Sequence, residues 1–119
     1  MDNDPANADA IKEVLDFERV TTMAVYKIEE LDKQIAKFAP DLLVMSISLK
    51  NSDGSALCRR LKNSEDHSHI RIILLSTQYN VLKDERLIGC FDDFLEKPFT
   101  AEELVEKVLQ SLHPVPGAA

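Results

Sequence analysis

The stretch Pro40-Asp-Leu-Leu-Val-Met-Ser-Ile-Ser-Leu-Lys-Asn-Ser-Asp-Gly54 decides the fold of this chain. Its middle part, residues 42–49, consists of six apolar residues and two serines, whereas a strand with one face in water would alternate between apolar and polar residues. Such a run is typical of a strand that is buried on both faces, inside a parallel sheet covered by helices. Pro40 begins the strand, and the turn residues 51–54 end it.

Short apolar or β-branched runs elsewhere in the chain predict three further strands, apolar residues at helical spacing predict four helices, and a poorly periodic segment predicts a fifth. The strands are expected at 20–25, 70–75 and 91–95, and the helices at 4–17, 28–38, 53–62, 81–88 and 100–112. Because the strands are too far apart for hairpins, this order predicts an α/β layer fold with right-handed crossovers.

Capping residues mark three of the helix starts. Asp4 and Pro5 suit the N-cap and the first position of the first helix, because an amide at that position would have no partner within the helix. Asp53-Gly54-Ser55 is expected to cap the third helix, and Thr100 with Glu103 predicts a capping box for the last one.

Length and composition limit the classes of protein to consider. The 119 residues fit one domain, expected over 1–113, followed by a disordered tail at 114–119. A net charge of −7 without a run of Lys or Arg argues against a broad nucleic-acid surface. No apolar segment reaches about 18 residues and the N-terminus is acidic, so we expect a cytoplasmic protein with no membrane span and no signal peptide.

Cysteine and histidine spacing predicts no metal site. Cys58 and Cys90 lack the spacing of metal ligands, so we expect reduced thiols packed as small apolar side chains. His67 and His69 lie two positions apart in a predicted loop, but no third ligand accompanies them.

Polar residues lie at the ends of three predicted strands. Ser46 is in the strand that begins at Pro40, Ser76 follows the next strand, and Lys97 follows the last one. Because the carboxyl ends of parallel strands meet at one edge of a sheet, where ligands bind, we expect these three side chains to lie near one another.

These segments resemble the receiver domain of two-component response regulators. The likeness rests on residues 40–46 with Asp53-Gly54, on Leu74-Leu-Ser76 and on Phe91-Asp-Asp-Phe-Leu-Glu-Lys-Pro-Phe99, and it covers almost the whole chain. It implies an α/β fold with a doubly wound parallel sheet of the flavodoxin-like receiver type. It also implies a role in two-component signal transduction.

By this resemblance, Asp2 and Asn3 stand where the family has an acidic pair that binds Mg²⁺, and Ser46 stands where it has the phosphoacceptor aspartate. A carboxylate attacks a phosphoryl donor because it is ionised at pH 7, whereas a serine hydroxyl needs a base beside it, and the sequence indicates none. With fewer acids facing Lys97, we expect weak or no Mg²⁺ binding, no other cofactor and no acyl phosphate.

Four further positions receive roles from the resemblance. Ser76 and Lys97 take the places of the hydroxyl and the lysine that contact the phosphoryl group, Phe94 that of the switch aromatic and Pro98 that of a cis-proline. Simpler roles are also open: Ser76 as a strand-end hydrogen-bonding group, Lys97 as an ion-pair partner of Asp2, and Phe94 as a packing residue.

The first strand of the family fold is missing from this sequence. In the family the acidic pair follows that strand, which lies in the middle of the sheet, but here Asp2 comes directly after Met1. A vacant centre leaves the backbone groups of both neighbouring strands without partners. Three explanations stay open: the chain begins downstream of its natural start, a partner supplies a strand, which in a homodimer would be strand exchange, or the sheet closes differently.

Taken together, the residues predict a degenerate receiver, or pseudo-receiver, that is not an enzyme. We expect it to contact a signalling kinase or a downstream effector protein through the region from Val81 to Leu112, without phosphorylation. It would bind neither nucleic acid nor a membrane.

Three alternatives remain. Ser46 and Lys97 would form the nucleophile and base of a hydrolase if the lysine were neutral. Asp53 would serve as a displaced acceptor in a conventional phosphorelay. A Ser/Thr kinase would act on Ser46 or Ser48, whose phosphate would meet Lys97.

Overall fold

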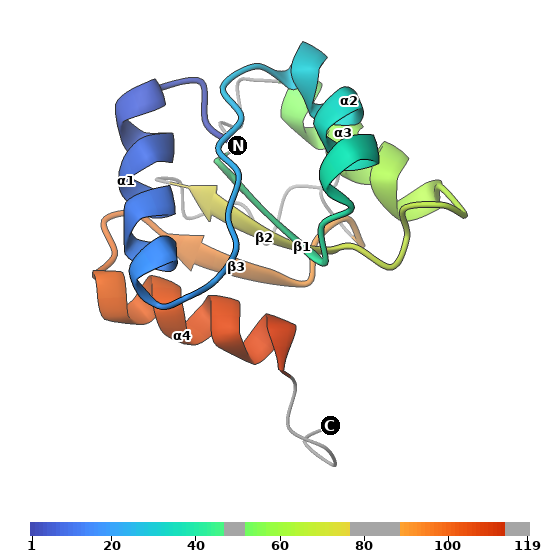
Figure 1. Ribbon diagram of the computed structural model, residues 1–119. Helices are drawn as coiled ribbons and strands as arrows, with labels where there is room; N and C mark the ends of the chain where they lie inside the picture. The colour runs from blue at the N-terminus through green and yellow to red at the C-terminus, as the bar shows by residue number, and fades with distance from the viewer. Residues whose placement is uncertain (47–51, 77–88, 114–119) are drawn as a thin grey trace.

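The structure is a computed structural model that describes residues 1–46, 52–76 and 89–113 (Figure 1). The expected helix at 81–88 and the tail at 114–119 lie outside these residues, as do Ile47 to Asn51. No helix in the described ranges is long and apolar enough to cross a membrane. The elements are α1 (Pro5–Phe17), α2 (Ile28–Phe38), β1 (Leu42–Ser46), α3 (Ser52–Asn63), β2 (Arg71–Ser76), β3 (Asp93–Glu96) and α4 (Ala101–Leu112).

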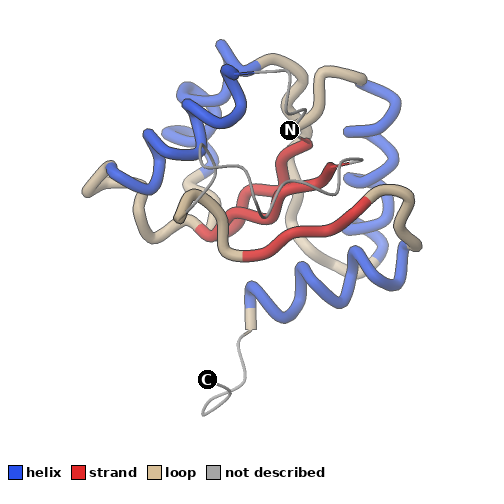
Figure 2. Tube along the Cα trace, turned by 180° about the vertical axis from the view of Figure 1, so that it is seen from behind, coloured by secondary structure: helices blue, strands red, loops and turns tan. Residues whose placement is uncertain are grey.

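The three strands form a parallel sheet in the order β1-β2-β3. Figure 2 shows this sheet as one layer with helices on both sides. Side chains of α2 and α3 join one core cluster, which includes Ile72 and Leu74 of β2, while α1 and α4 join the other, which includes Ile73 and Leu75. Successive residues of β2 therefore point to opposite faces and are all buried after Arg71, as expected for a central parallel strand.

Local capping explains where two of the helices begin. The carboxylate of Asp4 accepts a hydrogen bond from the Ala6 amide, and Pro5 opens α1. Thr100 and Glu103 form a reciprocal capping box at the start of α4, in which each side chain accepts from the backbone amide of the other residue. Both predictions are confirmed because capping depends on neighbours in sequence.

Two predicted elements are wrong in detail. Residues 20–25 form no strand, because no described strand runs alongside them. Among the described residues, the segment receives a single backbone hydrogen bond on the side of β1, from the Asp2 amide to the Val25 carbonyl. Helix α3 begins at Ser52, so Asp53 and Gly54 lie in its first turn and do not precede it as caps.

Both cysteines are free and buried in the core beneath α2 and α3, as predicted. The Cys58 thiol donates a hydrogen bond of 2.6 Å to the Cys90 carbonyl. Burial, followed by the influence of Cys90, raises the pKa of the Cys58 thiol to about 12. Cys58 is therefore a packing residue with almost no thiolate at neutral pH.

Candidate functional site

Three side chains meet at the carboxyl end of the sheet and form what we call the Asp2–Ser46–Lys97 cluster. The Ser46 hydroxyl donates a hydrogen bond of 2.7 Å to Oδ2 of Asp2. Nζ of Lys97 donates to the Ser46 hydroxyl over 3.2 Å and lies 3.7 Å from the same Asp2 oxygen. The cluster therefore joins a carboxylate, a hydroxyl and an ammonium within direct contact of one another.

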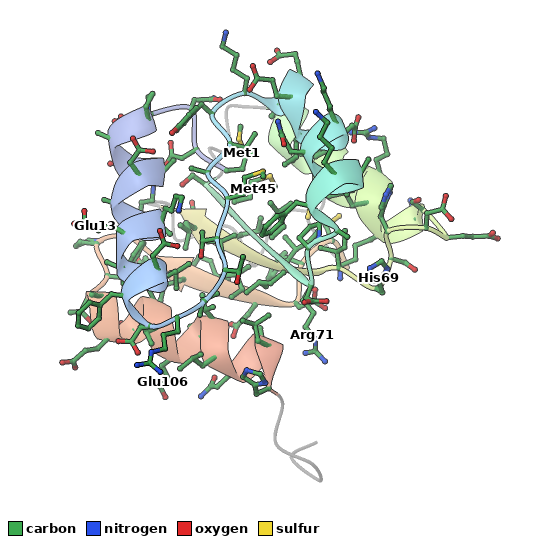
Figure 3. All side chains as sticks on the ribbon, viewed as in Figure 1. Met1, Glu13, Met45, His69, Arg71 and Glu106 are labelled. Atoms are coloured by element: carbon green, nitrogen blue, oxygen red, sulfur yellow. The ribbon has the colours of Figure 1, made fainter. Side chains whose placement is uncertain are left out.

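Backbone hydrogen bonds at the N-terminus hold Asp2 in this position. The Met1 amino group donates to the Val44 carbonyl over 2.7 Å, and the Ser46 amide donates to the Met1 carbonyl over 3.0 Å. On the other side, the Asp2 amide donates to the Val25 carbonyl over 3.1 Å. Met1 lies close to Met45 as a result (Figure 3). The N-terminus thus sits between β1 and the segment 20–25.

The Asp2 carboxylate is buried yet ionised. Burial raises its pKa, but the hydrogen bonds from the Asp4 amide and the Ser46 hydroxyl, together with the charges of Lys97 and the N-terminus, outweigh burial and lower the pKa overall. A carboxylate with a lowered pKa is a weak base. Asp2 is therefore suited to orient the Ser46 hydroxyl and poorly suited to remove the proton of that hydroxyl.

The sequence indicated no base beside Ser46, whereas the structure places the Asp2 carboxylate in a hydrogen bond with it, although the lowered pKa makes this carboxylate a weak base. The signal for this contact was the family resemblance, which places Asp2 and Ser46 in the same site. The expectation that Lys97 pairs with Asp2 agrees with the geometry. Nζ of Lys97 lies close enough to contact Ser46 and Asp2 at the same time.

The residues present do not fit a Mg²⁺ site. Mg²⁺ prefers six oxygens in octahedral array, usually including more than one carboxylate when substrate phosphate is absent. Here Asp2 accepts hydrogen bonds on both oxygens and faces the Lys97 ammonium, while Asp4 caps α1. Asn3 is exposed. Among the described residues, no group of three or more His, Cys, Asp or Glu side chains could hold a metal ion.

The remaining candidate residues lie around the cluster. Ser76 ends β2, is buried, and its carbonyl accepts a hydrogen bond of 2.7 Å from the Lys97 amide, which ties the ends of β2 and β3 together. The Lys97–Pro98 peptide bond is cis. Phe94 is half-buried and packs against the core beneath α2 and α3. The side chain of Asp53 and all of Ser48 lie outside what the structure describes.

Comparisons with known proteins identify the family and the fold of this chain. The family model of the response regulator receiver domain matches residues 1–109. The response regulator MprA of Mycobacterium ulcerans is 31% identical over 111 residues, which cover 91% of this chain and 46% of that protein. The transcriptional regulatory protein TrcR of Mycobacterium tuberculosis is 29% identical over 111 residues, which cover 91% of this chain and 42% of that protein. The chain thus spans less than half the length of these curated relatives.

Solved structures with the same fold come from several organisms. The receiver domain of a signal transduction histidine kinase from Syntrophus aciditrophicus has a TM-score of 0.83 at 28% identity and covers 100% of this chain and 91% of that one. A two-component response regulator from Clostridium difficile has a TM-score of 0.81 at 25% identity, and the match covers 95% of this chain and 92% of that one. With the sheet, its helices and the strand-end residues as described, the chain belongs to the family of response regulator receiver domains.

Proposed function

We propose that this receiver domain of two-component signalling acts by protein contact and is not phosphorylated at its strand-end site. The observation that carries the proposal is the Asp2–Ser46–Lys97 cluster: a hydroxyl stands at the end of β1, hydrogen-bonded to a carboxylate and to an ammonium. The resemblance assigns this position to an aspartate that receives the phosphoryl group. The cluster is therefore a degenerate form of that site.

Chemistry argues against transfer to Ser46. A serine attacks phosphorus well only when a base takes its proton, and the Asp2 carboxylate has a lowered pKa. Mg²⁺, which would neutralise charge during the transfer, meets a single carboxylate that is already paired with Lys97. Both the nucleophile and the metal site of a phosphorylated receiver are thus weakened together.

The proposed partner is a signalling kinase or a downstream effector protein. We place the contact on the region from Val81 to Leu112, of which β3 and α4 are described. On α4, Leu109 is 37% exposed and would add an apolar side chain to such a contact. Relatives that carry more than twice this length include one named a transcriptional regulatory protein, so a DNA-binding output would come from chain beyond the receiver.

A phosphodonor assay tests the proposal. The chain is incubated with acetyl phosphate and Mg²⁺ and its intact mass is measured. We expect no mass increase of one phosphoryl group. A stable adduct that disappears in Ser46→Ala would overturn the proposal, and an adduct that disappears in Asp53→Ala would support the displaced acceptor instead. Ser68→Ala, at an exposed position after α3, is the matched serine control.

A second candidate function is a hydrolase that uses Ser46 and Lys97, which the 3.2 Å contact between them favours. The lysine would have to be neutral to act as a base, yet the nearby Asp2 carboxylate stabilises its charged form. The hydroxyl proton also points to Asp2 and not to Lys97. Labelling of Ser46 by a fluorophosphonate probe would support this candidate over the signalling role.

A further inference from the structure

Strand β3 forms one edge of the sheet (Figure 1). It pairs with β2 on one side, and no strand of the described chain pairs with it on the other. The Lys97 amide donates to the Ser76 carbonyl, so every second residue counted back from Lys97 turns its backbone groups toward β2. Asp92, which precedes β3, bonds to β2 outside this alternation. Phe94 and Glu96 therefore turn their backbone groups toward the outer edge.

The outward-facing amide of Phe94 is already occupied. It donates a hydrogen bond of 2.8 Å to Oδ1 of the preceding residue, Asp93. Nζ of Lys107 on α4 donates to the same oxygen over 3.0 Å, so a second element holds this carboxylate in place. Both charged side chains are 34% exposed, and an ion pair this exposed adds little to stability. The main effect of the pair is to keep an acceptor on the edge amide.

An open strand edge is a template on which a strand of another chain can pair. Charged side chains at an edge are a common protection against such pairing. Here the protection is more specific than a charge, because the Asp93 carboxylate takes up the edge amide itself. A strand that approached from outside would have to displace this carboxylate and separate it from Lys107.

We propose that the Asp93–Lys107 pair is an autoinhibitory contact, which we call the edge guard, and that it keeps β3 from pairing with β3 of a second copy of this chain. Two identical edges meet antiparallel around a two-fold axis. Outward-facing residues pair with each other, so Phe94 of one copy would lie opposite Glu96 of the other, with the axis at Leu95. This register uses the Phe94 amide of both copies, and these are the two groups that the edge guard occupies.

The sequence of β3 suits pairing with itself. Leu95 would face Leu95 of the second copy across the axis, and apolar pairs at such positions stabilise antiparallel strands. The edge guard also keeps other copies away from β3 and α4, where we place the contact with a partner protein. The inference depends on backbone geometry at the edge and not on Ser46, so its outcome is separate from that of the phosphodonor assay.

Two variants remove the acceptor of the edge guard. Asp93→Ala deletes the carboxylate, and Asp93→Val also does so while its β-branched side chain favours a strand. Ultracentrifugation at millimolar concentration measures association, and circular dichroism checks the fold. We expect both variants to dimerise, with an association constant at least about tenfold above that of the unchanged chain, because each dimer gains two freed amides. Hydrogen exchange at the Phe94 and Glu96 amides should slow in the dimer.

Two control variants separate the hydrogen bond from the charge. Asp93→Asn loses the ion pair with Lys107, but its side-chain oxygen can still accept from the Phe94 amide, so we expect a monomer. Asp66→Ala, at an exposed position in the loop after α3, makes the same change in net charge and should also stay monomeric.

Four results would overturn the proposal. The first is that the two acceptor-free variants stay monomeric, or that neither of them folds, which would make Asp93 a structural residue. The second is that the unchanged chain dimerises to the same extent. The third is a dimer in which the Phe94 and Glu96 amides exchange as fast as in the monomer, which would place the interface elsewhere. The fourth is that Asp93→Asn or Asp66→Ala dimerises as strongly as Asp93→Ala, which would assign the effect to charge.

Discussion

The Ser46 hydroxyl donates a hydrogen bond of 2.7 Å to the carboxylate of Asp2, a residue 44 positions earlier in the chain. Lys97 contacts both groups from the end of β3. Because the carboxylate is buried and its pKa is lowered, the negative charge depends on the hydroxyl, the ammonium and the Asp4 amide for stabilisation. The contact links the N-terminus, β1 and β3, and its strength can be measured.

Replacing Asp2 by Asn should destabilise the fold by about 1–3 kcal/mol, because the Lys97 ammonium and the Ser46 hydroxyl lose a buried charged acceptor. The free energy of unfolding in urea measures the effect. Asp16→Asn is the control, since Asp16 forms an exposed ion pair with Lys12 on α1 and should change stability by less than about 0.5 kcal/mol. Equal effects of the two changes would contradict a role for the cluster in stability.

The double variant Ser46→Asp with Asn3→Asp should bind Mg²⁺ and form an adduct with acetyl phosphate. It restores two carboxylates beside Asp2 and Lys97, which supplies oxygen ligands and an ionised nucleophile. Calorimetry with Mg²⁺ and intact mass after phosphodonor treatment are the measurements. If the variant folds but neither binds Mg²⁺ nor forms the adduct, the geometry of the site also differs from that of a phosphorylated receiver. The two residue changes would then not suffice to explain the lost activity.

Stability should rise with pH between about 6 and 8. Burial lowers the pKa of the Met1 amino group from 8.0 to about 6, while the Asp2 charge opposes this shift. The unfolded chain then binds more protons than the folded chain within this window, so stability lost at pH 6 is regained by pH 8, by on the order of 2 kcal/mol.

The control for this pH dependence is the chain acetylated at its N-terminus. It keeps all three histidines but has no titrating amino group, so its unfolding free energy should lack this part of the slope. Urea unfolding at pH 6, 7 and 8 compares the two forms. An unchanged slope after acetylation would assign the dependence to other groups.

The Cys58 thiol should resist modification in the folded protein. With a pKa of about 12, roughly one molecule in ten thousand carries the thiolate at pH 8, and the side chain is fully buried. Ellman's reagent should therefore react with it at the rate of unfolding, and at once in urea. The Cys90→Ala variant has Cys58 as its one thiol. Fast reaction of this folded variant with Ellman's reagent would contradict the expectation.

Much of the fold followed from patterns that act over short distances. The amphipathic spacing of α2, the continuous apolar run of β2 and the capping box at Thr100 depend on residues a few positions apart, so each was predicted with bounds close to those observed. Ser46, Ser76 and Lys97 were also assigned correctly to neighbouring strand ends, because parallel strands align their carboxyl ends.

Residues 20–25 show the limit of this reasoning. Their β-branched composition is typical of a strand, yet a strand forms only where another one pairs with it, and among the described residues this segment receives a single backbone hydrogen bond on the β1 side, from Asp2. The resemblance placed Asp2 in the site of Ser46, but the direct hydrogen bond between them depends on the backbone bonds made by Met1, which no local pattern indicates.

Order along the chain was therefore enough to establish the layered α/β class, the capped starts of α1 and α4 and the set of polar residues at the sheet edge. Contacts between distant residues settled which of these residues touch and that the Asp2 carboxylate carries its charge in a buried place. Helical periodicity and capping are local, whereas strand pairing, burial and pKa depend on what the folded chain brings close.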